Sequence, residues 1–192
     1  MNKPLPLASE GVFQFSVPDA EVHLMPGEWF FGQNATVKTL LGSCVAMTLW
    51  HPRLHAGGMC HYLLPTRRPD AARPFTSPLS GRYGDEVIEL LVKALQRCGT
   101  HAGDYVVQLF GGADLLHEPM PRTPAWPLSA SAKFNVGKLN VEQAWTQVRR
   151  FGFDVNRVDV GEHVARRVSI DLSTGDVEVQ RGAARAHASR AA

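Results

Sequence analysis

The chain has 192 residues, a formal net charge of +2 at neutral pH and 44% hydrophobic residues. This length fills one hydrophobic core but not two large domains, and the small, scattered charge excludes an electrostatic surface for nucleic acid. Three cysteines without a secretory leader favour reduced thiols in a cytoplasm over a disulfide framework. No apolar run reaches the ~18 residues that a membrane span needs, so we expect no membrane insertion.

We divide the chain into three parts. Residues 1–21 are interpreted as an N-terminal leader, in which residues 12–15 have the pattern of a short strand. Residues 22–180 form the single folded domain, which begins with an early strand and a turn within residues 22–38. Residues 181–192 are rich in Ala and Arg and lack apolar anchors, so we expect a disordered tail.

Two short apolar runs, residues 43–50 and 59–64, predict neighbouring buried strands. If the chain turns back antiparallel between Pro52 and Arg53, Cys44 lies opposite His61, with Cβ atoms roughly 4.5–5.5 Å apart. Cys60 then points to the other face, because side chains alternate along a strand. A bulge at the glycine pair 57–58 would make this pairing slip.

A cysteine facing a histidine indicates nucleophilic chemistry. An imidazolium lowers the pKa of a thiol from about 8.5, so that thiolate is abundant at neutral pH. The thiolate attacks a carbonyl, and the histidine protonates the leaving group and later activates water. Buried cysteines and histidines also occur as ordinary core residues, so the spacing alone leaves both interpretations open.

The middle of the chain alternates regular and irregular segments. Residues 67–81, rich in Pro, Arg and Ser, predict a surface loop. Residues 85–98 predict an amphipathic helix that ends at Gly99. A buried strand over residues 105–110 follows and ends at Gly111-Gly112, where close backbone approach or positive φ is needed.

The last third begins with an irregular excursion over residues 115–131, which contain four prolines. A second helix is predicted over residues 141–151, with Asn140 as its N-cap. Strands are then predicted over three segments, of which the last two have the alternation of a hairpin: residues 154–160, 166–172 and 177–180.

Several blocks of the sequence resemble, in the same order, those of the CheD family, the chemoreceptor glutamine deamidases of bacterial chemotaxis. The first blocks surround the predicted cysteine and histidine: residues 39–46, 57–65 and 82–85. Later blocks match in the family's order at residues 110–113, 135–137, 159–161 and 174–177. The similarity spans about residues 25 to 180.

The resemblance implies an α/β fold of packed β-sheets with flanking helices, similar to the catalytic domain of the cytotoxic necrotizing factor toxins. It places the family's nucleophile at Cys44, its histidine at His61 and the threonine that completes the catalytic triad at Thr39. Under another gap placement, Lys38 or Thr36 takes the position of the threonine.

The implied reaction is deamidation of selected glutamines in the helical cytoplasmic region of methyl-accepting chemotaxis receptors, through a thioester on the cysteine. No cofactor or metal is expected, because the histidines and the cysteine of residues 51–61 lack the paired spacing of a zinc site. Two alternatives remain. One is a non-catalytic regulatory module that binds a CheC-type phosphatase, and the other is hydrolysis of receptor methyl esters.

Overall fold

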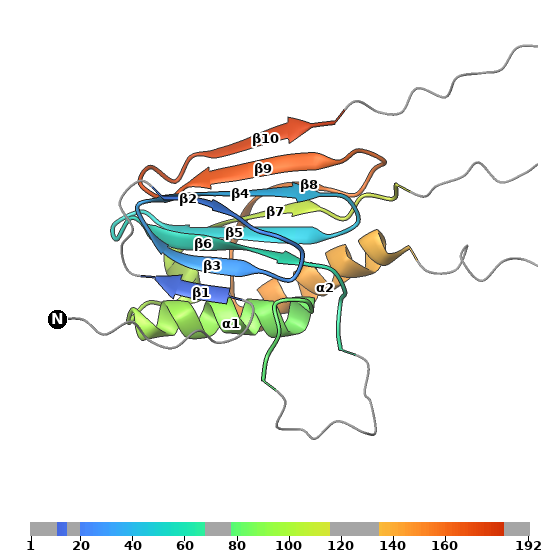
Figure 1. Ribbon diagram of the computed structural model, residues 1–192. Helices are drawn as coiled ribbons and strands as arrows, with labels where there is room; N and C mark the ends of the chain where they lie inside the picture. Colours follow the sequence, from blue (N-terminus) through green and yellow to red (C-terminus); the bar gives the residue numbers. More distant parts are fainter. Residues whose placement is uncertain (1–10, 15–19, 68–77, 116–134, 183–192) are drawn as a thin grey trace, which may run out of the picture.

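The computed structural model describes residues 11–14, 20–67, 78–115 and 135–182, which form a three-layered α/β structure (Figure 1). A pair of helices covers one face of a six-stranded sheet, and a four-stranded sheet packs on the other face. The predicted α/β class with packed sheets and flanking helices is therefore confirmed. The predicted tail from residue 183 onward lies outside the described residues.

The six-stranded sheet is mixed. In spatial order its strands are β1 (Gly11–Gln14), β3 (Trp29–Gln33), β6 (Ala56–Tyr62), β5 (Val45–His51), β7 (Val106–Gly111) and β8 (Val155–Val160). The four-stranded sheet has the order β10 (Val177–Arg181), β9 (Arg166–Asp171), β4 (Ala35–Leu41) and β2 (Ala20–His23). The helices are α1 (Gly84–Arg97), the short 3-10 helix η1 (Ala102–Asp104) and α2 (Val136–Phe151).

The early part of the chain is richer in strands than the sequence indicates. The segment predicted to hold one strand and a turn contains all of β3, the second half of β2 and the first four residues of β4. Asn34, with a φ of 52°, separates β3 in one sheet from β4 in the other. Asparagine tolerates this left-handed conformation, so one residue redirects the chain between layers. β1 and the first residues of β2 fall within the predicted leader. β1 is a strand of the six-stranded sheet, and β2 is a strand of the four-stranded sheet.

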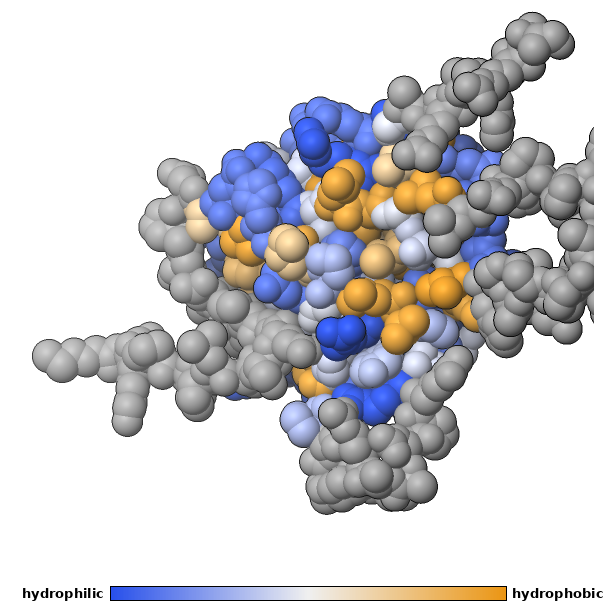
Figure 2. Space-filling view, turned by 45° about the vertical axis from the view of Figure 1, so that its right-hand side comes forward, coloured by the Kyte–Doolittle hydropathy of each residue, from blue (hydrophilic) through white to orange (hydrophobic). Residues whose placement is uncertain are grey.

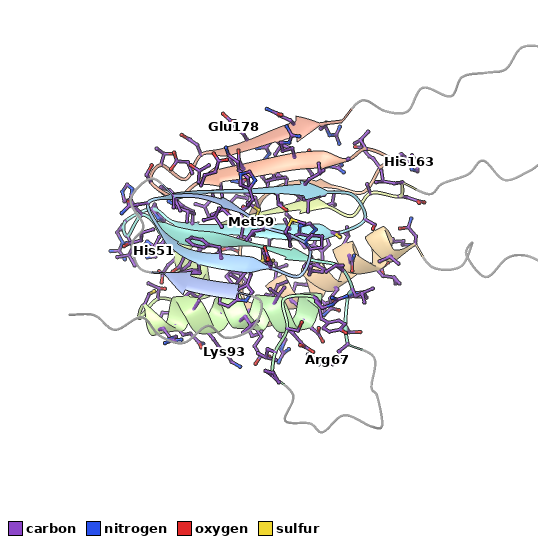
Figure 3. All side chains as sticks on the ribbon, in the orientation of Figure 1. His51, Met59, Arg67, Lys93, His163 and Glu178 are labelled. Carbon is purple, nitrogen blue, oxygen red and sulfur yellow. The ribbon has the colours of Figure 1, made fainter. Side chains whose placement is uncertain are left out.

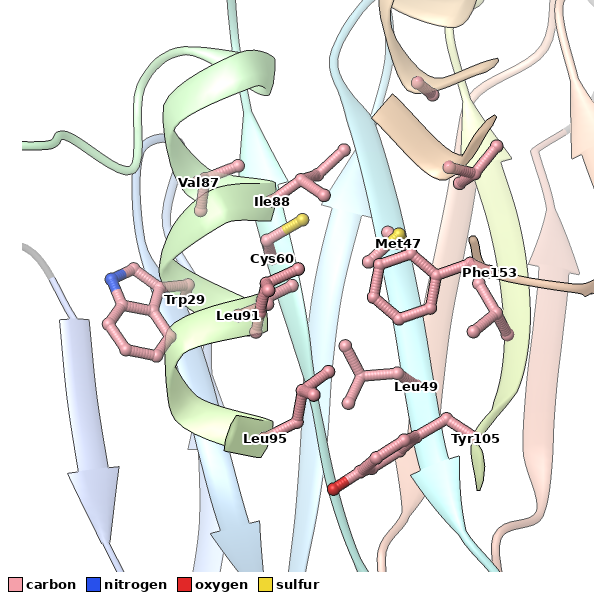
Figure 4. Packing of buried hydrophobic residues seen from close by; sticks show 14 of the residues in the cluster. Trp29, Met47, Leu49, Cys60, Val87, Ile88, Leu91, Leu95, Tyr105 and Phe153 are labelled. Carbon is pink, nitrogen blue, oxygen red and sulfur yellow. The ribbon is translucent and has the colours of Figure 1, made fainter. Parts of the chain in front are cut away.

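Alternation along the central strands divides the interior into two cores. Cys60 and Met47 face the helices and belong to the core that includes Leu91 of α1 (Figure 4). Met59 points the other way, into the core between the two sheets (Figure 3). Ala46 belongs to the same core. The predicted orientation of Cys60, away from the face that His61 occupies, is thus confirmed.

Helix α2 begins five residues earlier than predicted. Asn135 is its N-cap, because its side chain accepts a hydrogen bond of 2.9 Å from the N–H of Lys138. Gly152, with a φ of 73°, ends the helix. The predicted cap, Asn140, was wrong: it lies inside the helix and is fully buried.

Candidate active site

The hairpin of β5 and β6 brings the predicted cysteine and histidine to one end of the sheet, in a register that corrects the prediction. His61 pairs with Ala46, and the loop consists of residues 52–55. The ring of His51 accepts hydrogen bonds from the N–H groups of Arg53 and Leu54, which stabilises this four-residue loop. The two-residue turn that would place Cys44 directly opposite His61 does not form.

The register differs from the prediction by two residues, which preserves the face because side chains alternate with a period of two. Cys44 packs against the core between the sheets, on the side of β5 and β6 where His61 meets Thr39. Cys44 is therefore a diagonal neighbour of His61, a separation of roughly 7–8 Å between Cα atoms and less between side-chain atoms.

Backbone contacts with a glycine pair hold Cys44 at the end of the six-stranded sheet where β5 begins. Cys44 lies one residue before β5, and its carbonyl accepts a hydrogen bond of 2.7 Å from the N–H of Gly112. Gly111 and Gly112 have φ of 102° and 67°. A Cβ on Gly111 would come within 2.2 Å of the Cys44 carbonyl oxygen. The predicted need for close approach and positive φ at this pair is confirmed.

Thr39 connects the histidine to the neighbouring sheet. Its Oγ1 lies 2.8 Å from the Leu24 carbonyl oxygen and 2.7 Å from Nδ1 of His61. A carbonyl only accepts, so the single hydroxyl proton of Thr39 goes to Leu24 and the oxygen accepts from Nδ1–H. The proton of the neutral ring is thus on Nδ1. Nε2 has a free lone pair, is buried and has no hydrogen-bond partner among the described residues.

Of the three residues considered for the threonine position, Thr39 is the one that contacts His61. Lys38 and Thr36 lie on the opposite face of β4, because the strand alternates. Lys38 bonds to Glu21 instead. Among these three residues, Thr39 is therefore the one placed to orient His61.

Burial keeps both groups of the pair neutral. Burial raises the pKa of the Cys44 thiol above its ordinary value. It lowers the pKa of His61 to about 4, although the Leu24 carbonyl and the Glu28 carboxylate act in the opposite direction. The expected thiolate–imidazolium pair at neutral pH was wrong, because a sequence does not reveal how deeply the pair is buried. Burial thus favours a neutral thiol at Cys44 and a neutral ring at His61, on the same face of the hairpin.

Exposed apolar side chains surround this end of the sheet. Met25 follows Leu24, whose carbonyl bonds Thr39, and Leu115 lies over Gly42. Leu64 follows Leu63, and Leu139 precedes Asn140 in α2. We call these four residues the apolar rim: Met25 (63% exposed), Leu64 (39%), Leu115 (49%) and Leu139 (37%). Figure 2, which brings this end of the molecule forward, shows apolar side chains gathered among hydrophilic ones.

A buried amide at the same end escaped the sequence analysis. Asn140 donates to the carbonyls of Ser43 and Leu63. Both residues lie just beyond the last residue pair of β5 and β6. With α2 starting at Val136, Asn140 lies on the same buried helix face as Gly137 and Ala144. A polar residue on an apolar helix face is the signal that could have identified it.

A thiol, an imidazole with a free Nε2 and a threonine lie at one end of the layered sheets, and such a set of groups can carry out hydrolysis through a cysteine nucleophile. Within the described ranges, no three His, Cys, Asp or Glu side chains are placed to hold a metal ion. No helix in those ranges is long and apolar enough to cross a membrane.

Comparison with known proteins identifies the family. The family model described as CheD chemotactic sensory transduction matches residues 63–181. The chain is 39% identical over 165 residues to the probable chemoreceptor glutamine deamidase CheD of Pseudomonas fluorescens, which covers 85% of this chain and 86% of that protein. It is 38% identical over 173 residues to the probable chemoreceptor glutamine deamidase CheD 1 of Chromobacterium violaceum, covering 86% and 82%. The chain therefore belongs to the CheD family.

One solved structure is distantly similar, the Bacillus licheniformis hypothetical protein YfiH. It aligns with a TM-score of 0.38 and 9% identity, over 77% of this chain and 62% of that protein. A likeness at this level carries no argument about fold or function.

Proposed function

We propose that this chain converts selected glutamine side chains of methyl-accepting chemotaxis receptors to glutamate. The proposal rests on one observation: Thr39 fixes the ring of His61 so that a free, buried Nε2 lies on the same face of the hairpin as the Cys44 thiol. The relatives at 38–39% identity carry the name of chemoreceptor glutamine deamidases, which supports this substrate. The reaction would take place on the cytoplasmic helical region of the receptor.

In the proposed reaction, Nε2 of His61 takes the thiol proton as the sulfur of Cys44 bonds to the side-chain carbonyl carbon of glutamine. The imidazolium then gives that proton to the amide nitrogen, ammonia leaves, and a γ-glutamyl thioester remains on Cys44. A water molecule next gives a proton to Nε2 and attacks the thioester. Collapse releases glutamate, and the proton returns to the sulfur.

Proton transfer coupled to attack suits the electrostatics of the site. Because the pKa of the thiol is raised and that of His61 is lowered, charge separates only when the carbonyl carbon is within reach. Thr39 keeps Nδ1–H bonded throughout, so the ring does not turn when it becomes charged. We assign the Cys44 backbone N–H as one donor to the oxyanion.

The apolar rim supports a protein substrate rather than free glutamine. An amino acid that carries two charges at its α-carbon gains nothing from four exposed apolar side chains, whereas residues that flank a glutamine in a helix bury apolar area there. Similarity of the fold to the cytotoxic necrotizing factor catalytic domain stays part of this proposal. The packed sheets with flanking helices support it.

Incubating the protein with a purified cytoplasmic receptor fragment tests the function. We expect ammonia release in equal amount to a gain of about one dalton at each modified glutamine, located by peptide mass spectrometry. Release of methanol from a methylated fragment without ammonia would favour ester hydrolysis. Stimulation of a CheC-type phosphatase with neither product would favour the regulatory module.

Replacing Thr39 by valine should lower kcat about 10- to 100-fold, because a hydrogen bond to a group that becomes charged contributes about 1.5–3 kcal/mol. Valine keeps the shape of threonine but removes the hydroxyl that bonds Nδ1 of His61. Thr39→Ser is the matched control, since it retains the hydroxyl and should stay within a few-fold of wild type. Equal activities of the valine and serine variants would contradict the orienting role.

Replacing Leu139 by serine should raise the KM for the receptor fragment about tenfold with kcat retained, because losing a buried leucine contact costs about 1.5 kcal/mol. Leu54→Ser is the control. Leu54 is 41% exposed, against 37% for Leu139, but lies in the loop at the far end of the hairpin. If both variants change the KM equally, the apolar rim does not bind substrate.

A further inference from the structure

We propose that Asn140 is a positioning residue that sets the distance between the nucleophile segment and the His61 strand. This inference rests on the proposed function and adds a residue to its machinery. Asn140 is fully buried in the second turn of α2. Its Nδ2 lies 3.0 Å from the carbonyl oxygen of Ser43, which precedes the nucleophile, and 2.9 Å from that of Leu63.

These two hydrogen bonds replace the sheet ladder where it opens. The pairing of β5 with β6 ends at Val45 and Tyr62. Beyond that pair, Ser43 and Leu63 both present carbonyl oxygens, which only accept and therefore cannot bond each other. The amide of Asn140 lies between them and donates to each. The separation of the two segments that carry Cys44 and His61 is thus set by one side chain.

The hydrogen bonds of the Asn140 amide also indicate that it positions other groups and does not bind substrate. An amide nitrogen has two protons, and both are used by the two carbonyls, so Nδ2 has none left for an oxyanion. Oδ1 accepts only, and it is buried without a partner among the described residues. Asn140 therefore acts through the segments that it holds, and not by contact with substrate.

The helix that carries Asn140 is itself fixed against both segments. The hydroxyl of Tyr62 donates to the Asn140 carbonyl over 2.6 Å, which anchors α2 to the residue next to His61. A Cβ on Gly137 would come within 2.5 Å of the Gly112 carbonyl oxygen, so the first turn of α2 packs directly on the glycine pair. Gly112 in turn binds the Cys44 carbonyl. Helix α2 is therefore held by Tyr62 on the His61 strand and by the glycine pair that bonds Cys44, so the Asn140 side chain has little freedom to move.

Asn140→Asp tests the proposal, because it keeps the shape of the side chain and removes both donors. On the receptor fragment we expect kcat to fall at least tenfold with the KM within twofold of wild type, since the rim is untouched. Alkylation of Cys44 by iodoacetamide at neutral pH should slow about tenfold, because the displaced thiol no longer transfers its proton to Nε2. Thermal unfolding of the same samples gives the folded fraction.

Gln147→Glu is the matched control. It makes the same amide-to-carboxylate change on the buried side of α2, where Gln147 is 4% exposed and lies two turns from Asn140. It should leave kcat and the alkylation rate within twofold of wild type. A folded Asn140→Asp protein with unchanged kcat and alkylation would overturn the proposal, as would losses in both variants that follow only the folded fraction.

Tyr62→Phe is a second variant if Asn140→Asp does not fold. It removes only the hydroxyl that anchors the Asn140 carbonyl, and we expect kcat to fall three- to tenfold with the KM unchanged. Wild-type kcat in this variant would count against the proposal. If the wild-type protein releases no ammonia from any receptor fragment, the proposed function fails, and the alkylation rates of these variants still test how Asn140 places the thiol.

Discussion

Cys44→Ala is expected to lower receptor deamidation by at least about 10³-fold, because removing a nucleophile leaves only the contribution of binding and oxyanion donors. Cys44 is half-buried at the end of the sheet and is held through its carbonyl, which the substitution leaves in place. The variant should therefore fold. Ammonia release and the one-dalton mass shift, measured on the same receptor fragment, check the expectation.

Cys98→Ala is the control for this experiment. Cys98 follows α1 and packs partly against the helix-side core, so its thiol is on the other side of the six-stranded sheet from Cys44. It should retain wild-type deamidation. Binding to the receptor, and to a CheC-type phosphatase if one is a partner, should survive in both variants. Unchanged deamidation by Cys44→Ala would eliminate the proposed nucleophile.

The hairpin could be predicted from sequence because its two strands are apolar runs bounded by glycine and proline, and alternation fixes which side chains share a face. Its register could not. The loop is two residues longer than assumed, and it is stabilised by the ring of His51 and by the left-handed conformation of His55, with a φ of 47°. Histidine is not one of the residue types that usually signal such a loop. Cys44 and His61 still share one face of the hairpin because the register differs from the predicted one by two residues, an even number.

Besides the hairpin register, the burial of the site residues could not be predicted from local sequence patterns. The sequence places Thr39, Cys44 and His61 by resemblance. The protonation of Cys44 and His61, however, depends on the four-stranded sheet of β2, β4, β9 and β10 that packs over them and carries Thr39. Asn140 was assigned to a helix end for a related reason: asparagine is a common N-cap, and the buried carbonyls that occupy its amide come from residues about 77 and 97 positions away.

His61→Gln is expected to lower deamidation by at least about 10³-fold, because glutamine does not take the thiol proton. In the wild type, the low pKa of His61, about 4, keeps the base neutral well into acid. The rise of kcat/KM with pH should therefore be centred near pH 4 and not near the ordinary histidine value of about 6.5. His55→Gln, at the far end of the hairpin, should keep both activity and this profile. An acidic midpoint near 6.5 would contradict a buried, neutral His61.

The same substitution should change how stability depends on pH. Between pH 6.5 and 4 the unfolded chain protonates His61 while the native protein does not, so the free energy of unfolding falls as the pH falls through this window. From pH 7.5 to pH 5 the loss due to this residue is about 2 kcal/mol. Glutamine has no such proton, and all other groups titrate alike in both proteins. Urea unfolding at the two pH values should therefore show the wild type losing about 2 kcal/mol more than His61→Gln, and equal losses would place the ring in water instead of between the sheets.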